Sequence, residues 1–218
     1  MHSLREIMRL RESPRLDAVD LGRLSHPEAE KIMIDRVEKI ARGEATDQVL
    51  FCELEPIITV GRAGAAADFA HLKIPVQEVS RGGKATFHGL GQMVAYPLIH
   101  LAPDSRDLHA YLYSLETALI QTVETFGLKG GRDERNTGCW VGEKKIGAVG
   151  VAVRKWVTYH GVSLNVTTDL SWFRQFHPCG LEPEVMTSLE EQLGSAPSLT
   201  EVKDVFFAHL EEVLLPCR

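Results

Sequence analysis

Several features that would assign this chain to a specialised class of protein are missing from its sequence. Among 218 residues there are only four cysteines, at positions 52, 139, 179 and 217, and no C-x-x-C pair, which weighs against zinc and thioredoxin-type sites. No apolar run is long enough to cross a bilayer, so no membrane partner is expected. Residues 1–15 lack the apolar core of a secretory signal, and their arginines, mixed with Glu6 and Glu12, support an organellar transit peptide only weakly. These absences predict a cytoplasmic protein with free thiols.

The composition is that of an ordinary globular protein. Hydrophobic residues make up 44% and charged residues 25% of the chain, which argues against disorder and against a coiled coil. A chain of this length can bury a core without metal or disulfide support. We therefore predict an N-terminal extension over residues 1–18 and a single catalytic domain over residues 19–218. The formal net charge of −6 argues against a nucleic-acid partner.

Local patterns predict helices at the start, middle and end of the chain. Ser25 and Glu28 have the spacing of a capping box, which begins a helix that ends near Gly43. A second helix is expected over residues 105–126, and a third begins after Ser198. Between them are short candidate strands, over residues 49–54, 57–60, 76–79, 93–98 and within the block 139–166. Short strands adjacent in sequence favour an α+β fold with a mixed, largely antiparallel sheet flanked by helices.

The segment Arg81–Gln92 contains four glycines together with Arg, Lys, Thr, His and Gln side chains. Glycines let the backbone approach a ligand closely and adopt positive φ. The segment is not a phosphate-binding P-loop, because Glu78 stands where the first glycine belongs and Ala85 where Ser or Thr belongs. An incidental hairpin loop is the alternative, but the combination favours a binding loop.

Two residues are candidates for covalent chemistry. Cys179 lies between Pro178 and Gly180, which predict a turn that presents its side chain to a cleft. Its local sequence leaves a buried structural cysteine almost equally open. Lys145 directly precedes the apolar stretch 146–153. Most lysines in such a place are solvated turn residues, and the alternative is that the strand carries Lys145 partly into the interior. A buried lysine near a thiol favours the thiolate, although the sequence does not show that the two meet.

Six motifs occur in order over about residues 19–214. The longest is Arg81-Gly82-Gly83-x-x-Thr86-x-His88-Gly89-x-Gly91-Gln92-x-Val94-x-Tyr96-Pro97. The others begin with Glu53, Lys145, His160, Pro178 and Met186. Together the six motifs resemble those of the lipoyl(octanoyl) transferases. The chain departs from the family pattern at Leu90, where a proline is usual, and at Leu54, Glu55 and Ile58, where His, Pro and Tyr are frequent.

The resemblance implies a fold like that of the biotin and lipoate protein ligase catalytic domain, and octanoyl transfer in lipoate biosynthesis. The donor would be octanoyl-acyl carrier protein, and the acceptors would be lysines of lipoyl domains of 2-oxoacid dehydrogenase complexes and of the glycine cleavage H protein. Cys179 would carry the acyl thioester, and Lys145 would adjust the acidity of the thiol and move protons. The implied substrate-binding residues are Arg81, Gly82, Gly83, Lys84, Ala85, Thr86, Phe87, His88, Ala148, Val149, Gly150, Gly161, Val162 and Ser163. Neither a cofactor nor a metal is implied, because a thioester is already activated.

Three other functions remain open at this point. An ATP-dependent lipoate or biotin ligase would need no cysteine nucleophile, and the chain lacks a Gly-Arg-Gly-Arg run. A non-catalytic module would bind acyl chains or lipoyl domains without turnover. A Cys-His hydrolase is conceivable because the chain contains His88, His160 and His177, but it would waste the acyl group.

Charge is unevenly distributed along the chain. Residues 61–155 contain 12 basic and nine acidic side chains, whereas the remainder contains 12 basic and 21 acidic ones. Acyl carrier proteins and many lipoyl domains are acidic, so a local positive rim would attract them. We predict that this rim includes Arg62, Lys84, Arg132, Arg135, Arg154 and Lys155.

Overall fold

The computed structural model describes residues 16–214. The expected N-terminal extension, residues 1–18, lies almost entirely outside the described residues, as does Cys217. Strand β1 begins at Asp17, two residues before the start of the predicted catalytic domain. Within residues 16–214, no helix is both long and apolar enough to cross a membrane.

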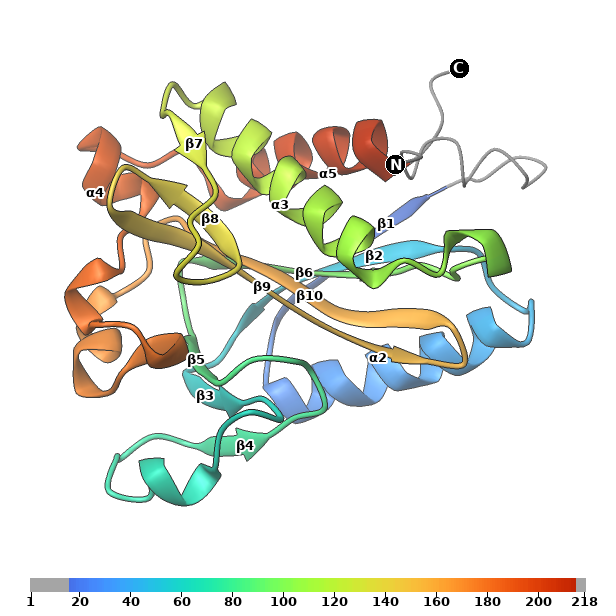
Figure 1. Ribbon diagram of the computed structural model, residues 1–218, viewed down its shortest axis with the longest axis horizontal. Helices are drawn as coiled ribbons and strands as arrows, with labels where there is room; N and C mark the ends of the chain where they lie inside the picture. The colour runs from blue at the N-terminus through green and yellow to red at the C-terminus, as the bar shows by residue number, and fades with distance from the viewer. Residues whose placement is uncertain (1–15, 215–218) are drawn as a thin grey trace.

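A seven-stranded sheet forms the centre of the molecule (Figure 1). Its spatial order is β1 (Asp17–Leu24), β2 (Gln48–Leu54), β6 (Gln92–Leu98), β10 (Val157–Asn165), β9 (Lys144–Arg154), β8 (Gly138–Val141) and β7 (Gly130–Gly131). Only β1 and β2 are parallel, and the other neighbours pair antiparallel. The predicted mixed, largely antiparallel sheet is therefore confirmed, although β1 was not among the expected strands.

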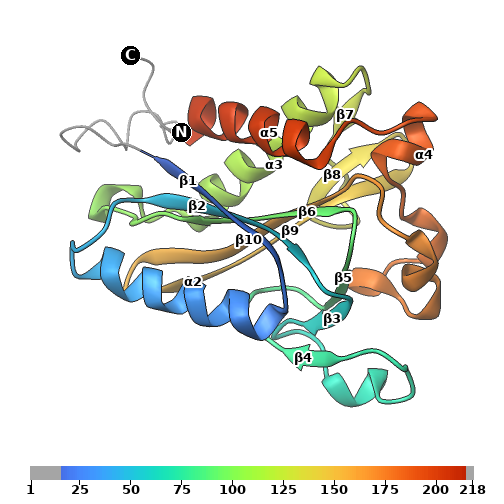
Figure 2. The same cartoon turned by 180° about the vertical axis from the view of Figure 1, so that it is seen from behind.

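Helices cover both faces of this sheet (Figures 1 and 2). α2 (His26–Ala41) packs on one face, and α3 (Leu108–Thr125) and α5 (Leu199–Leu214) pack on the other. Alternation along β2 shows how one strand serves both layers, because Val49 and Phe51 face α3 and α5 while Leu50, Cys52 and Leu54 face α2. The Ser25–Glu28 capping box begins α2 as predicted.

A smaller sheet lies beside one end of the large one, in the order β4 (Val76–Glu78), β3 (Ile57–Val60) and β5 (Ala85–His88). The middle of the glycine-rich segment is thus a strand rather than a loop. Stacking explains this, since the Phe87 ring lies 5.6 Å from the Trp172 ring and 5.5 Å from the Phe173 ring. Short 3₁₀ turns precede β4 and α3, namely η2 (Ala66–Phe69) and η3 (Pro103–Ser105).

The segment after β10 leaves the sheet and returns to it. It contains the 3₁₀ turns η4 (Leu170–Gln175), η5 (Pro178–Gly180) and η6 (Pro183–Val185), and α4 (Leu189–Leu193) follows. At its start the Thr167 N–H donates to Gly91 O (2.9 Å), and at its end the Thr187 N–H donates to Lys145 O (3.0 Å). Both ends of the segment that carries Cys179 are therefore attached to the large sheet.

Candidate active site

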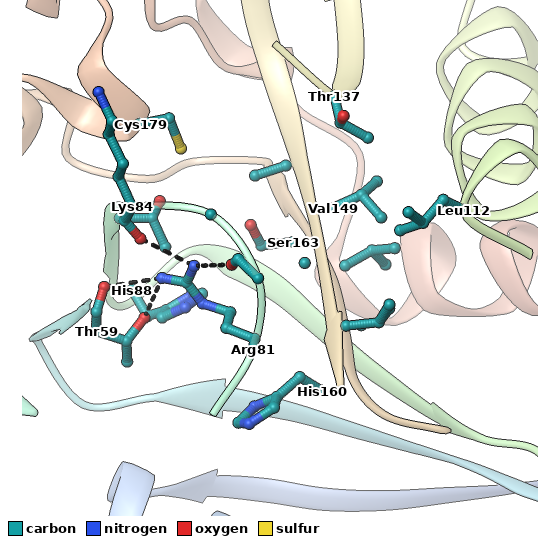
Figure 3. A pocket seen from close by; sticks show the side chains of 18 of the residues that line it. Thr59, Arg81, Lys84, His88, Leu112, Thr137, Val149, His160, Ser163 and Cys179 are labelled. Atoms are coloured by element: carbon teal, nitrogen blue, oxygen red, sulfur yellow. Dashed lines mark hydrogen bonds between the residues drawn. The ribbon is translucent and has the colours of Figure 1, made fainter. Parts of the chain in front are cut away.

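A cavity of about 200 Å³ lies where β9, β10, the glycine-rich segment and η5 meet (Figure 3). It is lined by most of the predicted site residues: Arg81, Gly82, Gly83, Lys84, Thr86, His88, Ala148, Val149, Gly150, Gly161, Val162, Ser163 and Cys179. The side chains of Ala85 and Phe87 point the other way along β5 and pack in the hydrophobic cluster of the small sheet. Lys145 does not line the cavity itself, but it contacts Asn136 and Thr137, which do.

Cys179 occupies a tight turn and has a left-handed backbone conformation, with φ 56° and ψ 16°. The turn is closed by hydrogen bonds from the Gly180 N–H to His177 O (3.0 Å) and from the Leu181 N–H to Pro178 O (2.9 Å). A residue other than glycine at such a φ is strained, and strain of this kind gathers at functional sites. The thiol is half-buried and faces the cavity (Figure 3).

The other described cysteines are in a different environment. Cys52 and Cys139 are free thiols with no exposed surface. Burial raises the pKa of each to about 12, because the apolar interior disfavours the thiolate. Both are therefore the small buried hydrophobes that their local sequences predict.

Arg81 holds the glycine-rich segment in shape. Its guanidinium is buried and donates to Thr59 O (2.8 Å), Thr59 Oγ1 (2.9 Å), Gly82 O (2.9 Å) and Lys84 O (2.9 Å). Gly61 allows this close packing, because a Cβ there would lie 2.5 Å from Gly83 O. The hydrogen bonds of the Arg81 side chain thus position the loop backbone at the cavity.

Of the two alternatives left open for Lys145, the structure shows the buried one, with 1% of its surface exposed. Its Nζ donates to Asn136 Oδ1 and to Thr137 O (2.9 Å), and both of these residues line the cavity. Burial lowers the pKa of the Lys145 ammonium, while Cys179 and Glu116 oppose that shift. No hydrogen bond joins Lys145 to Cys179 in the described part of the chain.

Asn136 and Thr137 are site residues that sequence reasoning missed. They precede β8 in an Asn-Thr-Gly sequence, which signals a turn but not a place at the lysine. A Cβ on Gly138 would lie 2.9 Å from Lys145 Cε and 2.3 Å from Gly147 O, so only glycine fits beside this lysine.

A chain of buried hydrogen bonds links the loop to the segment that carries the cysteine. His88 Nδ1 lies 2.7 Å from Gln92 Oε1, and Gln92 Nε2 donates to Asn165 Oδ1 (2.9 Å). Asn165 Nδ2 in turn donates to Thr187 O (2.9 Å). Fully paired buried networks of this type rigidify a site. Gln92 lies within the motif that begins with Arg81, and Asn165 within the motif that begins with His160. The sequence could therefore have indicated both as site residues.

The histidines around the cavity are buried and unsuited to proton transfer with the cysteine. Burial lowers the pKa of His88 and of His160 to about 3, so both imidazoles are neutral near pH 7. Within residues 16–214, no histidine hydrogen-bonds to Cys179. This geometry weighs against a Cys-His hydrolase.

The predicted basic rim is only partly present. Lys84 lines the cavity and Arg62 is exposed close to the loop. Four of the six side chains instead form ion pairs within the chain: Arg132, Arg135, Arg154 and Lys155. The prediction is wrong for the last two, because both pair with Glu38 at 2.7 Å, and the β9–β10 turn lies at the far end of its hairpin from η5 (Figure 1).

Comparisons with known proteins agree with this geometry. The family model "Lipoyl protein ligase A/B catalytic domain" matches residues 29–211. An octanoyltransferase of Thermoanaerobacter sp. (strain X514) is 36% identical over 216 residues, covering 91% of this chain and 93% of the relative. An octanoyltransferase of Bdellovibrio bacteriovorus is 40% identical over 212 residues, covering 89% and 97%.

Solved structures of ligases share the fold. A bi-partite lipoate protein ligase from Thermoplasma acidophilum superposes with a TM-score of 0.70 at 18% identity, covering 94% of this chain and 86% of the other. A biotin protein ligase from Aquifex aeolicus in complex with biotin and ATP gives 0.54 at 15% identity, covering 91% and 70%. The predicted ligase-like α+β fold is thus confirmed. By its family match and its octanoyltransferase relatives, the chain belongs to the octanoyltransferases of the lipoyl protein ligase A/B family and is an acyltransferase of lipoate biosynthesis.

Proposed function

We propose that Cys179 takes an octanoyl group from octanoyl-acyl carrier protein as a thioester and passes it to a lysine of a lipoyl domain. One observation carries this proposal. A single small cavity is lined by a strained, half-buried thiol, by a glycine-rich backbone and by the two residues that bind a buried lysine. A nucleophile, backbone donors and a proton acceptor are the parts that acyl transfer needs.

In the first half-reaction, Cys179 Sγ attacks the thioester carbonyl of the donor. A new C–S bond forms, the old one breaks, and the donor thiol leaves with the proton that Cys179 gives up. Because one thioester replaces another, this step is nearly isoenergetic. Gly83 and Lys84 of the glycine-rich segment line the cavity, and backbone N–H groups of this segment would stabilise the tetrahedral oxyanion.

In the second half-reaction, the acceptor lysine attacks the acyl-Cys179 carbonyl and must first lose a proton. Its pKa in water is about 10.4, so it arrives mainly as ammonium. Lys145 suits the role of proton acceptor, because burial lowers its pKa and favours the neutral amine. The C–N bond then forms and the C–S bond breaks. The second proton lost by the attacking nitrogen goes to the Cys179 sulfur, and the proton held by Lys145 is released to solvent.

The octanoyl chain would lie along the apolar wall of the cavity. Leu112, Val149 and Val162 line this wall, and glycines at 150 and 161 leave space between them. The volume of about 200 Å³ is below the ~300–1,000 Å³ of drug-sized pockets, which suits one narrow chain.

We include the acceptors and the location in the same proposal. The acceptors would be lipoyl domains of 2-oxoacid dehydrogenase complexes and of the glycine cleavage H protein, and the compartment would be the cytoplasm. The free state of Cys52, Cys139 and Cys179 is compatible with a reducing compartment. Neither ATP nor a metal enters the proposed steps, because the donor thioester supplies the activation.

The experiment is to incubate the protein with octanoyl-acyl carrier protein and to look for a hydroxylamine-labile octanoyl adduct by intact-protein mass spectrometry. We expect the adduct on Cys179, its loss in Cys179→Ala, and its retention in Cys52→Ala. Addition of a lipoyl domain should discharge the adduct and octanoylate one lysine. Full activity in Cys179→Ala would contradict the proposal.

The same assay separates the alternatives. An ATP-dependent ligase would octanoylate the lipoyl domain from free octanoate and ATP, with no adduct on the enzyme. A binding module would retain octanoyl-acyl carrier protein without turnover. The solved ligases share the fold of this chain, but at 15–18% identity the likeness does not indicate that this chain catalyses their reaction.

A further inference from the structure

A second cavity, of about 600 Å³, lies on the other side of the cysteine turn. One wall comes from η2 and the residues after it, including Phe69 and His71. The opposite wall comes from the segment that carries Cys179, including Arg174, Phe176 and Gly180. None of these residues lines the first cavity, and the proposed acyl transfer uses none of them.

The two cavities meet at the cysteine. Lys84 lines both of them, while Cys179 lines the first and the adjacent Gly180 lines the second. A Cβ built on Gly180 would lie 2.8 Å from Lys84 Nζ, so the ammonium group lies directly against the cysteine turn (Figure 3). The turn thus separates a small cavity from a larger one, with a single lysine at the junction.

A thioester donor has two limbs that extend in opposite directions from its sulfur. When Cys179 Sγ attacks, the acyl chain needs space on one side of the reacting carbonyl and the thiol-bearing arm needs space on the other. The first cavity accounts for the acyl limb only. The second cavity is lined by Gly180, the residue next to the cysteine, and is the larger of the two.

We propose that the second cavity holds the phosphopantetheine arm of the acyl carrier protein, with Arg174 as the contact for its phosphate. This inference rests on the proposed function. It adds the channel through which the donor reaches Cys179 and a residue that selects the donor.

The chemistry of the cavity matches that arm. Its floor is apolar, with the Phe69 and Phe176 rings packed edge to face at a centroid distance of 5.7 Å. Its lining includes four groups that are cationic or able to become so, against one carboxylate from Asp68: Lys84, Arg174, His71 and His177. An aliphatic amide chain that ends in a phosphate presents the complementary surfaces. The exposed guanidinium of Arg174 can contact a phosphate through two parallel hydrogen bonds.

The test compares donors that differ only in the arm. The donors are octanoyl-4′-phosphopantetheine, octanoyl-pantetheine, which lacks the phosphate, and octanoyl-N-acetylcysteamine, which lacks most of the arm. The variant is Arg174→Glu, and the matched control is Lys73→Glu, an exposed charge reversal in the same region that does not line the cavity. The readout is kcat/KM for acylation of Cys179, followed by mass spectrometry.

We expect Arg174→Glu to lower the preference for the phosphorylated over the unphosphorylated arm by about tenfold, mainly through KM, while Lys73→Glu keeps the wild-type preference. The loss with octanoyl-acyl carrier protein should match the loss with octanoyl-4′-phosphopantetheine. An equal loss for all donors would overturn the proposal, because Arg174 would then act on the cysteine turn. An unchanged preference would overturn it as well.

A binding measurement keeps this inference separate from the proposed function. Titration of the Cys179→Ala protein with 4′-phosphopantetheine should show binding that pantetheine does not match and that Arg174→Glu weakens. If no donor acylates the wild-type protein, the proposed function fails, and the titration still decides whether the cavity binds the arm. Absence of binding, or equal binding of both compounds, would contradict the inference.

Discussion

The two residues proposed for the chemistry belong to regions built in opposite ways. Lys145 is on β9, paired with strands on both sides, and is 1% exposed. Cys179 is on a three-residue turn in a left-handed conformation and is half-buried. The strand gives the lysine a fixed, buried environment, whereas the turn presents the thiol to the first cavity.

This difference matters because burial acts oppositely on the two kinds of group. It lowers the pKa of Lys145, which favours a neutral amine able to accept a proton. It raises the pKa of Cys52 and Cys139 to about 12, which removes the thiolate. A nucleophilic cysteine therefore has to lie outside the core, while a proton-accepting lysine gains from being inside it.

The largest expected effect comes from substituting the buried residue of the pair, Lys145. Lys145→Met should lower the rate of octanoyl transfer to a lipoyl domain by about 10²–10⁴-fold, the usual contribution of a positioned acid or base. Lys145→Arg should not restore the rate, because a guanidinium does not lose its proton in proteins. Single-turnover discharge of octanoyl-Cys179 across pH 6–9 is the measurement. The control is Lys144→Met, an exposed neighbour. A wild-type rate in Lys145→Met would remove Lys145 from the mechanism.

The contrasting environment of the half-buried Cys179 is tested by the reactivity of its thiol. Iodoacetamide at pH 8 should modify Cys179 at least about 100-fold faster than Cys52 or Cys139, because thiolate is the reactive form and burial suppresses it at these two positions. Time-resolved peptide mass spectrometry of the folded protein measures the three rates. Comparable rates for all three cysteines would show that the contrast in environment does not exist in solution.

The loop between the two regions depends on Arg81. Arg81→Met removes the buried hydrogen bonds to Thr59 O and Thr59 Oγ1, which should destabilise the protein by about 3 kcal/mol. Arg62→Met, at an exposed neighbour, should change the stability by less than about 0.5 kcal/mol. Urea unfolding followed by circular dichroism gives both values. Equal stability of the two variants would show that the Arg81 hydrogen bonds do not hold the loop.

The last expected effect is a dependence of stability on pH. The pKa of His160 is about 3 in the folded protein, and near 6.5 for an unfolded chain. Its contribution is therefore present above pH 6.5 and is lost as the pH falls toward 3, by up to about 1.4 kcal/mol per pH unit. His160→Asn tolerates the positive φ at this position and should flatten the slope between pH 6 and 4. His109→Asn, on the surface, should leave the slope unchanged.

The sequence predicts those features that depend on neighbouring residues. The Ser25–Glu28 cap and the largely antiparallel sheet follow from local spacing and alternation, whereas the sequence left the burial of Lys145 open. β1 was missed because its side chains alternate between half-buried and exposed at the sheet edge, without an apolar run. Asn136 and the second cavity were missed because they arise where distant segments meet, and no local pattern encodes such a meeting.

The attachment of both ends of the Cys179 segment has a consequence for how the protein tolerates change. The segment between Thr167 and Thr187 leaves the sheet, and its two ends are held by hydrogen bonds to Gly91 and Lys145. Doubling the length of such a loop raises the entropic free-energy cost of closing it by only about 0.6 kcal/mol. Insertions between the two ends of this segment and the Cys179 turn can therefore reshape the second cavity while the sheet and the lysine keep their places.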